Sequence, residues 1–418
     1  MNPNLQHLQP YPFQKLRQLL DGVRPEPTLS HIDLSVGEPK HPAPAFVQQT
    51  LANALEKLSS YPGTQGTVEL RTTIADWLQR RFHLNTTPDI TREVLPVNGT
   101  REALFAFAQC VVNQNPKAST DTDSDTGTGT DTDTDTAPLV LMPNPFYQIY
   151  EGAALLAGAT PHYLPCTADT GFNVDFSAVP AEVWQRCQLI YTCSPGNPAG
   201  AVIPTEQLKQ LIELADTYDF VIASDECYSE IYFDDNTPPP SLLQACAELG
   251  RDDYRRCVVF HSLSKRSNLP GLRSGFVAGD GDILSQFLQY RTYHGCAMPI
   301  HHQLASIAAW NDEDHVRENR RLYREKFAAV LPILQGHLKV SKPDAGFYLW
   351  AETPIADDQF TRQLLTEQHI TVVPGSYLAR TDANQLNPGE NRIRMALVAP
   401  VEQCQEAAER LVRFVGNL

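Results

Sequence analysis

The feature that most constrains the fold is a series of short apolar segments that alternate with helical patterns. Each apolar segment is rich in Val, Ile, Leu or Phe and lacks polar alternation, which is typical of strands buried on both faces of a mostly parallel sheet. Over residues 205–219, between two such segments, apolar side chains recur at helical spacing. We therefore expect an α/β fold with helices on both faces of the sheet. The expected strands are residues 139–143, 188–195, 220–226, 257–262 and 275–280.

The composition indicates a soluble globular protein and argues against several functions. A chain of 418 residues is long enough for two domains with a substantial core. No segment approaches the roughly 20 apolar residues of a membrane span, and the first residues lack the apolar region of a signal peptide, so we expect a cytoplasmic protein without membrane contact. The net charge of −16 argues against nucleic-acid binding. The nine cysteines form no CxxC pair, which predicts reduced thiols and no metal site.

Changes of pattern along the chain predict two domains and one insertion. Alternating strands and helices occupy residues 41–295, the expected large domain. Residues 296–418 read as a smaller α+β domain, and residues 1–40 as an N-terminal arm that forms part of it. Residues 119–138 are almost entirely Thr, Asp and Gly, and six aspartates in this segment contribute to the net charge. With nothing to bury, this segment is expected to be a disordered insertion in a surface loop.

The first candidate binding element is the segment VNGTREALFAFAQ, residues 97–109. It predicts a turn followed by a helix that opens at Gly99 and Thr100. The backbone amides of Thr100 and Arg101 would then lack helical partners and form an anion site at the helix N-terminus. A plain capped helix would explain the same pattern.

Two further candidates follow predicted strands. Asn197 lies between Gly196 and Pro198 in a stiff turn, where it could bind a ligand or simply its own backbone. Asp225 ends a buried strand, and a carboxylate there requires a partner because burial disfavours its charge. Tyr228 follows three residues later and could present its hydroxyl to the same place.

The segment HSLSKRSNLPGLRSG, residues 261–275, places hydroxyl groups and cations around one lysine. Crowding by positive charge lowers the pKa of an ammonium group, and the neutral amine of Lys265 would be a nucleophile. Ser262, Ser264 and Arg273 could hold a phosphate. A solvated basic loop is the simpler alternative, and the pattern gives no role to Arg266.

Together these elements describe one ligand. It has a phosphate, an aldehyde for the lysine, a ring nitrogen that needs a negative partner and a ring oxygen that accepts hydrogen bonds. Pyridoxal 5′-phosphate has each of these groups. The sequence therefore predicts a site for this cofactor.

The chain resembles the pyridoxal-phosphate aminotransferases of class I/II, which have the fold called type I. The resemblance covers nearly the whole chain, and the motifs of the family occur in the expected order. The resemblance implies a large domain with a mostly parallel sheet between helices and a smaller α+β domain. It also implies that Lys265 is the catalytic residue, bonded to the cofactor aldehyde and moving a proton at the substrate Cα. The family patterns SxSK…GxR, NPxG and DexY are matched by Ser262, Ser264, Lys265, Gly271 and Arg273, by Asn197, Pro198 and Gly200, and by Asp225 and Tyr228.

The same resemblance assigns roles to residues elsewhere in the chain. Tyr147 would stack on the cofactor ring, and Tyr61 would reach the cofactor phosphate of a neighbouring subunit in a homodimer with shared active sites. Gly37 would contact the substrate together with Asn197. Arg394, in the segment RIRMALV, would clamp the substrate α-carboxylate in a bidentate pair, although a strand arginine that meets a surface acid would look the same.

Within the family, the segments SLSKRSNLPGLRSGFVAGD, RTYHGCAMP and NPGENRIRMALVAP are similar to those of N-succinyldiaminopimelate aminotransferases. This implies transfer between glutamate/2-oxoglutarate and N-succinyl-LL-2,6-diaminopimelate or its 6-oxo form, in lysine (diaminopimelate) biosynthesis. A second substrate carboxylate then needs a further contact, for which Arg380, Arg291 and Tyr293 are unranked candidates. A broader aspartate- or aromatic-type aminotransferase, a C–S lyase and a non-catalytic ligand-sensing domain are the alternatives.

Overall fold

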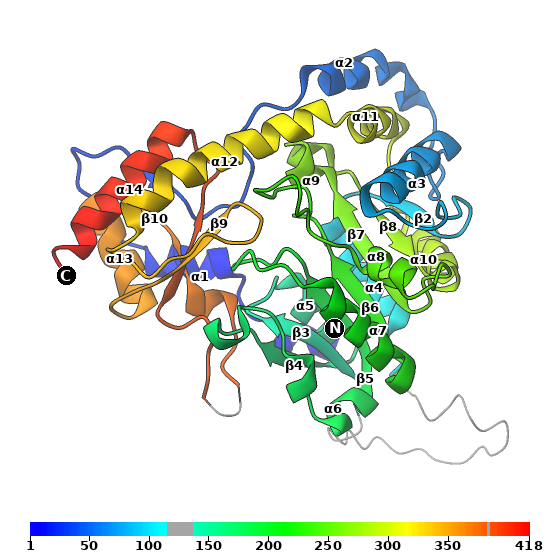
Figure 1. The fold of residues 1–418 in the computed structure, drawn as a ribbon, viewed down its shortest axis with the longest axis horizontal. Helices are drawn as coiled ribbons and strands as arrows, with labels where there is room; N and C mark the ends of the chain where they lie inside the picture. Colours follow the sequence, from blue (N-terminus) through cyan, green and yellow to red (C-terminus); the bar gives the residue numbers. More distant parts are fainter. Residues whose placement is uncertain (115–136, 383–384) are drawn as a thin grey trace.

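The computed structural model describes residues 1–114, 137–382 and 385–418, and its centre is a seven-stranded sheet (Figure 1). The strand order is β2-β8-β7-β6-β5-β3-β4. Each strand predicted from an apolar segment is present, so the expected α/β architecture is confirmed. The strands are β2 (Val94–Val97), β3 (Leu139–Asn144), β4 (Thr160–Pro165), β5 (Cys187–Cys193), β6 (Val221–Asp225), β7 (Cys257–Ser262) and β8 (Gly275–Gly279).

Helices cover both faces of this sheet. Successive residues of one strand pack on opposite sides, as Ile222 and Ala223 of β6 do, which explains why the strand segments are apolar without alternation. Side chains of α3 (Val68–Phe82), α7 (Thr205–Tyr218), α8 (Leu242–Glu248) and α11 (Ile300–Asn311) pack against one face. Those of α4 (Thr100–Val111), α5 (Ile149–Leu156) and α10 (Gly281–His294) pack against the other.

Strand direction brings several chain segments to one edge of the sheet. Strands β3 to β7 are parallel to one another, whereas β8 is antiparallel to both β7 and β2. The last residue of β5 pairs with Asp225, and Ser262 pairs with Gly275, the first residue of β8. The residues that follow β2, β5, β6 and β7 and those that precede β8 therefore meet at the same edge, where ligands bind in such sheets.

A smaller body stands beside the sheet and has its own core. It contains the three-stranded antiparallel sheet β11-β12-β9, and Figure 1 shows α12 and α14 side by side against it. Phe327, Phe360 and Phe414 lie in its apolar core. The elements are β9 (Tyr348–Glu352), β11 (Val373–Pro374), β12 (Arg392–Ala396), α12 (Asp314–Leu334), α13 (Asp357–Gln368) and α14 (Val401–Val415).

The N-terminal arm crosses this smaller body before the chain enters the large sheet. Helix α1 (Pro12–Leu19) contacts β11, and β1 (Ile32–Asp33) pairs in parallel with β10 (Ile370–Thr371). Helix α2 (Ala45–Asn53) follows, and α11, which begins beyond residue 295, packs against α2 and α3. The domain boundaries given above stay predictions.

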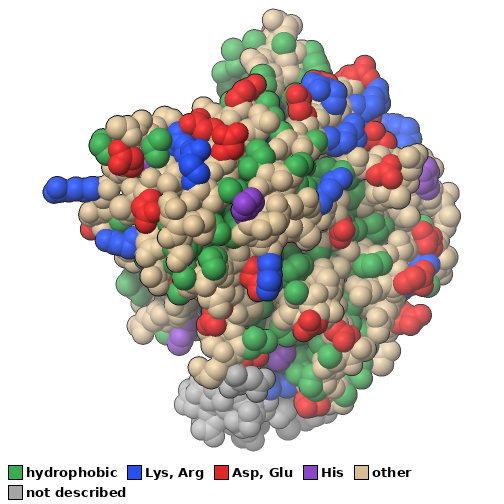
Figure 2. Space-filling view, turned by 60° about the vertical axis from the view of Figure 1, so that its left-hand side comes forward, with side chains coloured by type: hydrophobic (Ala, Val, Ile, Leu, Met, Phe, Trp, Pro, Cys, Tyr) green, Lys and Arg blue, Asp and Glu red, His purple; other side chains and the backbone are tan. Residues whose placement is uncertain are grey.

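The predicted insertion at 119–138 lies, up to residue 136, outside the described residues. Its flanks agree with the sequence pattern, because α4 ends at Val111 and β3 begins at Leu139. All nine cysteines are free thiols. Figure 2 shows one face of the molecule, on which Lys and Arg side chains are interspersed with Asp and Glu. Over the described ranges, no helix combines the length and apolar character needed to cross a membrane.

Candidate active site

A cavity of about 420 Å³ opens at the edge of the sheet where the strand ends meet. This volume suits a small-molecule ligand. Its walls come from the large sheet, from the smaller body and from the N-terminal arm, which adds Tyr11, Pro12 and Phe13. The predicted site residues that line it are Gly37, Thr100, Arg101, Tyr147, Asn197, Asp225, Tyr228, Ser262, Ser264, Lys265, Arg273 and Arg394.

One end of the cavity is rich in donors for an anion. Gly99 precedes α4 with φ +85°, and a Cβ there would lie 2.3 Å from Nη2 of Arg273, so only glycine lets the guanidinium approach this turn. No side chain caps α4, which leaves the first amides of the helix available. The Ser262 hydroxyl donates to that of Ser264 at 2.9 Å. Hydroxyls, amides and a guanidinium therefore lie around the same end of the cavity, and such a set of donors could hold an anion.

Asp225 is a buried carboxylate, 5% exposed, in the floor of the cavity. Burial raises its pKa, and hydrogen bonds from the Cys227 amide (3.2 Å) and the Tyr150 hydroxyl (2.7 Å) favour the charged form. No cationic side chain lies within 4.0 Å of it in the part of the chain that the structure describes. The carboxylate is thus oriented by two hydrogen bonds, and a cationic group of a ligand would stabilise its charge.

Tyr150 is a site residue that the sequence did not reveal. Its spacing from Asp225 gives no sign of contact, because the two residues are 75 positions apart and meet only through the packing of α5 on the sheet. The hydroxyl of Tyr228, considered as a neighbour of Asp225, instead hydrogen-bonds that of Tyr348 at 3.1 Å while its side chain lines the cavity.

Lys265 lies in the short helix α9 (Leu263–Arg266) and extends into the cavity. Its ammonium group donates to the Gly37 carbonyl. Burial lowers its pKa to about 8, and the positive charges of Arg394 and Arg273 add to the effect. The sequence attributed the lowered pKa to like charge alone, whereas loss of solvent is the larger cause. Roughly a tenth of such an amine is neutral at pH 7.

Arg394 and Asn197 stand together at another side of the cavity. The guanidinium donates from Nη1 to Asn197 Oδ1 (3.0 Å) and from Nη2 to the Ser35 carbonyl (2.8 Å), and it stacks on the Tyr348 ring. Arg394 is 4% exposed, and among the described residues no carboxylate lies within 4.0 Å of it. The alternative of a pair with a surface acid therefore fails, and the cation is free to bind a ligand carboxylate.

Other candidates from the sequence lie away from the cavity. Arg291 is fully buried against Glu102 (2.8 Å), and Arg380 forms two hydrogen bonds with Glu151. Tyr293 is 88% exposed. None of these three lines the cavity. The side chain of Tyr61 is also fully exposed, and its predicted place at a neighbouring subunit stays a prediction.

Arg266, left without a role by the sequence, supports the segment that carries Lys265. Its buried guanidinium donates to Glu313 (2.6 Å) and to the Ala309 carbonyl (2.8 Å), and it stacks on Trp310. These contacts fix α9 against the junction of α11 and α12.

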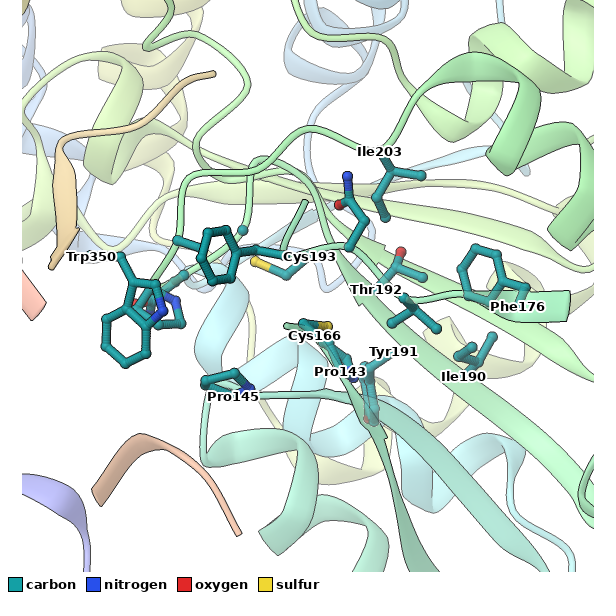
Figure 3. A pocket seen from close by; sticks show the side chains of 17 residues that line it. Pro143, Pro145, Cys166, Phe176, Ile190, Tyr191, Thr192, Cys193, Ile203 and Trp350 are labelled. Carbon is teal, nitrogen blue, oxygen red and sulfur yellow. The ribbon is translucent and has the colours of Figure 1, made fainter. Parts of the chain in front are cut away.

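A smaller apolar cavity of about 30 Å³ adjoins the site at Cys193 and Asn197 (Figure 3). The Thr192 hydroxyl and the Trp350 indole N–H, both in its wall, have no hydrogen-bond partner among the described residues. The space holds about two water molecules, and none of the residues that line it is charged.

Comparisons with known proteins agree with this geometry. A family model described as aminotransferase class I and II matches residues 30–411. An LL-diaminopimelate aminotransferase of Desulforudis audaxviator (strain MP104C) is 30% identical, over 99% of this chain and 97% of that protein. The crystal structure of an aminotransferase from Neisseria meningitidis is 48% identical, covers 99% of both chains and has a TM-score of 0.90. A probable N-succinyldiaminopimelate aminotransferase from Thermus thermophilus is 25% identical, over 96% of this chain and 100% of that chain, with a TM-score of 0.82.

Proposed function

Since the chain belongs to the class I and II aminotransferases, a family that depends on pyridoxal phosphate, we propose that it transfers an amino group to and from a diaminopimelate-type substrate. The first candidate pair is glutamate/2-oxoglutarate with N-succinyl-LL-2,6-diaminopimelate and its 6-oxo form, in lysine biosynthesis. The observation that carries the proposal is one cavity lined at once by Lys265, Asp225 and Arg394. The names of the relatives support the diaminopimelate skeleton.

The residues of the cavity fit the cofactor of the family. The hydroxyls of Ser262 and Ser264, the amides at the start of α4 and the Arg273 guanidinium form a donor set for its phosphate. Asp225 supplies the negative partner for its ring nitrogen, and Asn197 and Tyr228 supply donors for its ring oxygen. Tyr147 would lie against its ring. When bound, the cofactor supplies an aldehyde for the amino group and a ring that takes up electrons from a bond broken at Cα.

The chain's own groups would bind the substrate and move its proton. Arg394 would pair with the α-carboxylate and so fix the Cα, with Asn197 holding the guanidinium in place. The Lys265 amine, whose pKa of about 8 leaves part of it neutral at pH 7, would take the Cα proton and return it during the reverse step. The Gly37 carbonyl accepts the hydrogen bond that holds this amine in the resting site.

The relatives favour a second candidate, unsubstituted LL-2,6-diaminopimelate, because the curated proteins at about 30% identity are named for it. The two substrates differ in one chemical consequence. Removal of one amino group from LL-diaminopimelate leaves a free amine that condenses with the new ketone and loses water, whereas an N-succinyl amide cannot do so. The mass of the product therefore distinguishes the two reactions.

The test is amino transfer to 2-oxoglutarate by the cofactor-loaded protein, with N-succinyl-LL-diaminopimelate, LL-diaminopimelate and aspartate as donors. The proposal predicts a kcat/KM for one diaminopimelate at least about tenfold above that for aspartate, which corresponds to about 1.4 kcal/mol. Preference for the unsubstituted form would select the second candidate. Equal rates with aspartate, or pyruvate released from cystathionine without glutamate formation, would overturn the proposal.

We also infer that the protein acts as a cytoplasmic homodimer, with Tyr61 directed to the partner's cofactor phosphate. What supports this is the complete exposure of the Tyr61 side chain in the single chain. An equal mixture of Tyr61→Phe chains and Lys265→Ala chains tests whether the two subunits share a site. Activity of this mixture should differ from the average of the two parent proteins, and equality with that average would contradict the inference.

A further inference from the structure

Arg101 is an exposed cation that lines the cavity, and its side chain has no anionic partner among the described residues. Its Nε donates to the Tyr147 hydroxyl at 2.5 Å and its Nη2 to the Tyr11 hydroxyl at 3.1 Å, and it lies beside both rings. Its Nη1 group has no partner within the described ranges, where no carboxylate lies within 4.0 Å of the guanidinium either. The side chain is exposed, so it is available to a ligand that enters the cavity.

The other charged side chains of the cavity have proposed roles, whereas the side chain of Arg101 has none. Lys265 acts at Cα, Arg273 belongs to the phosphate end and Arg394 to the α-carboxylate, while Asp225 is the carboxylate of the floor. The role predicted for Arg101 uses its backbone amide, which remains compatible with another role for its side chain. One cation, Arg101, thus remains among the residues that line the described cavity, and its Nη1 group is available to a ligand.

A substrate with two carboxylates needs such a cation. Each partner in the proposed reaction, whether glutamate or a diaminopimelate, carries a second carboxylate beyond the one at the reacting Cα. Arg291 and Arg380 cannot meet it, because they are held by Glu102 and Glu151 away from the cavity. The small cavity near Trp350 has no charged residue in its lining.

We propose that the Arg101 guanidinium, supported by the Tyr11 hydroxyl, binds the distal carboxylate of both the amino donor and the amino acceptor. This proposal rests on the proposed function. It names the class of substrates of the same site, which are acyclic amino and keto acids with two carboxylates. Arg101 is held from two sides, by Tyr147 of the large domain and by Tyr11 of the N-terminal arm, so its position is fixed before the ligand arrives. Substrates of different length would share this contact through different chain conformations.

Binding of two unreactive acids of equal length tests the contact directly. Glutarate and pentanoate differ by one carboxylate, and their affinities for the cofactor-loaded protein are measured by calorimetry. The wild type is expected to prefer glutarate, and Arg101→Leu should reduce this preference about 30-fold because a carboxylate then enters without its cation. Arg101→Lys, which keeps the charge, should lose less than the leucine variant. Arg92→Leu, at an exposed arginine paired with Asp282, is the matched control and should keep the wild-type preference.

Steady-state kinetics test the same contact through the ratio of kcat/KM for glutamate to kcat/KM for norvaline. Norvaline is an amino acid of similar length whose side chain is neutral. Arg101→Leu should lower this ratio by a similar factor, mainly through the KM for glutamate. A preference for glutarate within twofold of the wild-type value in Arg101→Leu, or no such preference in the wild type, would overturn the inference. If the dicarboxylate preference depends on Arg101 but no diaminopimelate reacts, the proposed function fails and this assignment stands.

Discussion

Two lysines with the same shift in pKa occupy different regions of the molecule. Burial lowers the pKa of both Lys265 and Lys326 to about 8. Lys265 lines the large cavity, with Arg273 and Arg394 as neighbours. Lys326 is 3% exposed within the smaller body, where it donates to the Val398 carbonyl at 3.0 Å and lies over the Tyr323 ring.

The comparison shows that a lowered pKa records burial and does not by itself identify a catalytic amine. What distinguishes Lys265 is access to a cavity whose lining also holds two serine hydroxyls, the buried Asp225 carboxylate and the Arg394 guanidinium. Lys326 has its ammonium group against a backbone carbonyl and lines neither the large cavity nor the small one. The account therefore predicts unequal consequences for the loss of the two amines.

The largest effect is expected from removal of each amine in turn. Lys265→Ala should lower kcat about 10⁴-fold, because the amine proposed to move the Cα proton is then lost. Lys326→Met, which keeps a similar volume, should leave kcat within a few-fold of the wild type. Steady-state transfer to 2-oxoglutarate measures both, and equal losses in the two variants would refute the distinction.

A smaller effect is expected at the arginine beside Lys265. Arg394→Gln should lower kcat/KM about 100-fold, because the substrate carboxylate loses a buried, charged partner. Arg392, two residues earlier on β12 and near Glu352, is the matched control, since it lies outside the cavity. Arg392→Gln should change kcat/KM less than threefold, and a loss comparable to that of Arg394→Gln would remove the basis for the assigned role.

Tyr150→Phe tests the support of Asp225. Loss of one hydrogen bond to the carboxylate should lower kcat/KM about tenfold. The phenol also favours the charged form of Asp225, so the pKa of this carboxyl should rise in the variant. Cofactor affinity, measured by fluorescence titration, should weaken in parallel. An unchanged affinity and rate would show that the Cys227 amide alone orients Asp225.

The last effect concerns stability without cofactor and leaves the activity of the loaded protein unaddressed. Both lysines titrate near pH 8 when folded and near pH 10.4 when unfolded, so the unfolded chain binds more protons between these values. The free energy of unfolding should therefore rise with pH over this window and be reduced below it. Lys265→Met and Lys326→Met should each stabilise the cofactor-free protein at pH 7 by about 3 kcal/mol, with the gain vanishing above about pH 10.5. Urea unfolding at pH 7 and pH 10 measures this, and a gain independent of pH would contradict it.

Local patterns of the sequence predicted the sheet and cavity residues such as Asp225 and Lys265, whereas Gly37, Tyr147 and Arg394 followed from the resemblance to the family. Apolar segments mark strands buried on both faces, and the residues just after them, such as Asp225 and Ser262, must meet where parallel strands end. Lys265 was recognisable from its own neighbours in the chain. These predictions needed no knowledge of how distant segments pack.

The remainder depended on contacts between distant segments. Tyr150 reaches Asp225, and Tyr11 reaches Arg101, across 75 and 90 positions of the chain. The spacing of the sequence contains no sign of either pair. Arg291 and Arg380 looked equivalent to any other unpaired arginine until the structure showed Glu102 and Glu151 beside them. Arg266 likewise gained a role only from its contacts with Glu313 and Trp310.

Reduction of the cofactor-loaded protein with borohydride, followed by mass spectrometry of its peptides, tests the central claim most directly. The account predicts an absorbance band near the edge of the visible range that reduction abolishes, with a phosphopyridoxyl group left on Lys265 alone. A Lys265→Ala variant should lack both the band and the label. A label on Lys326, or an unlabelled and colourless wild-type protein after incubation with pyridoxal phosphate, would contradict the account.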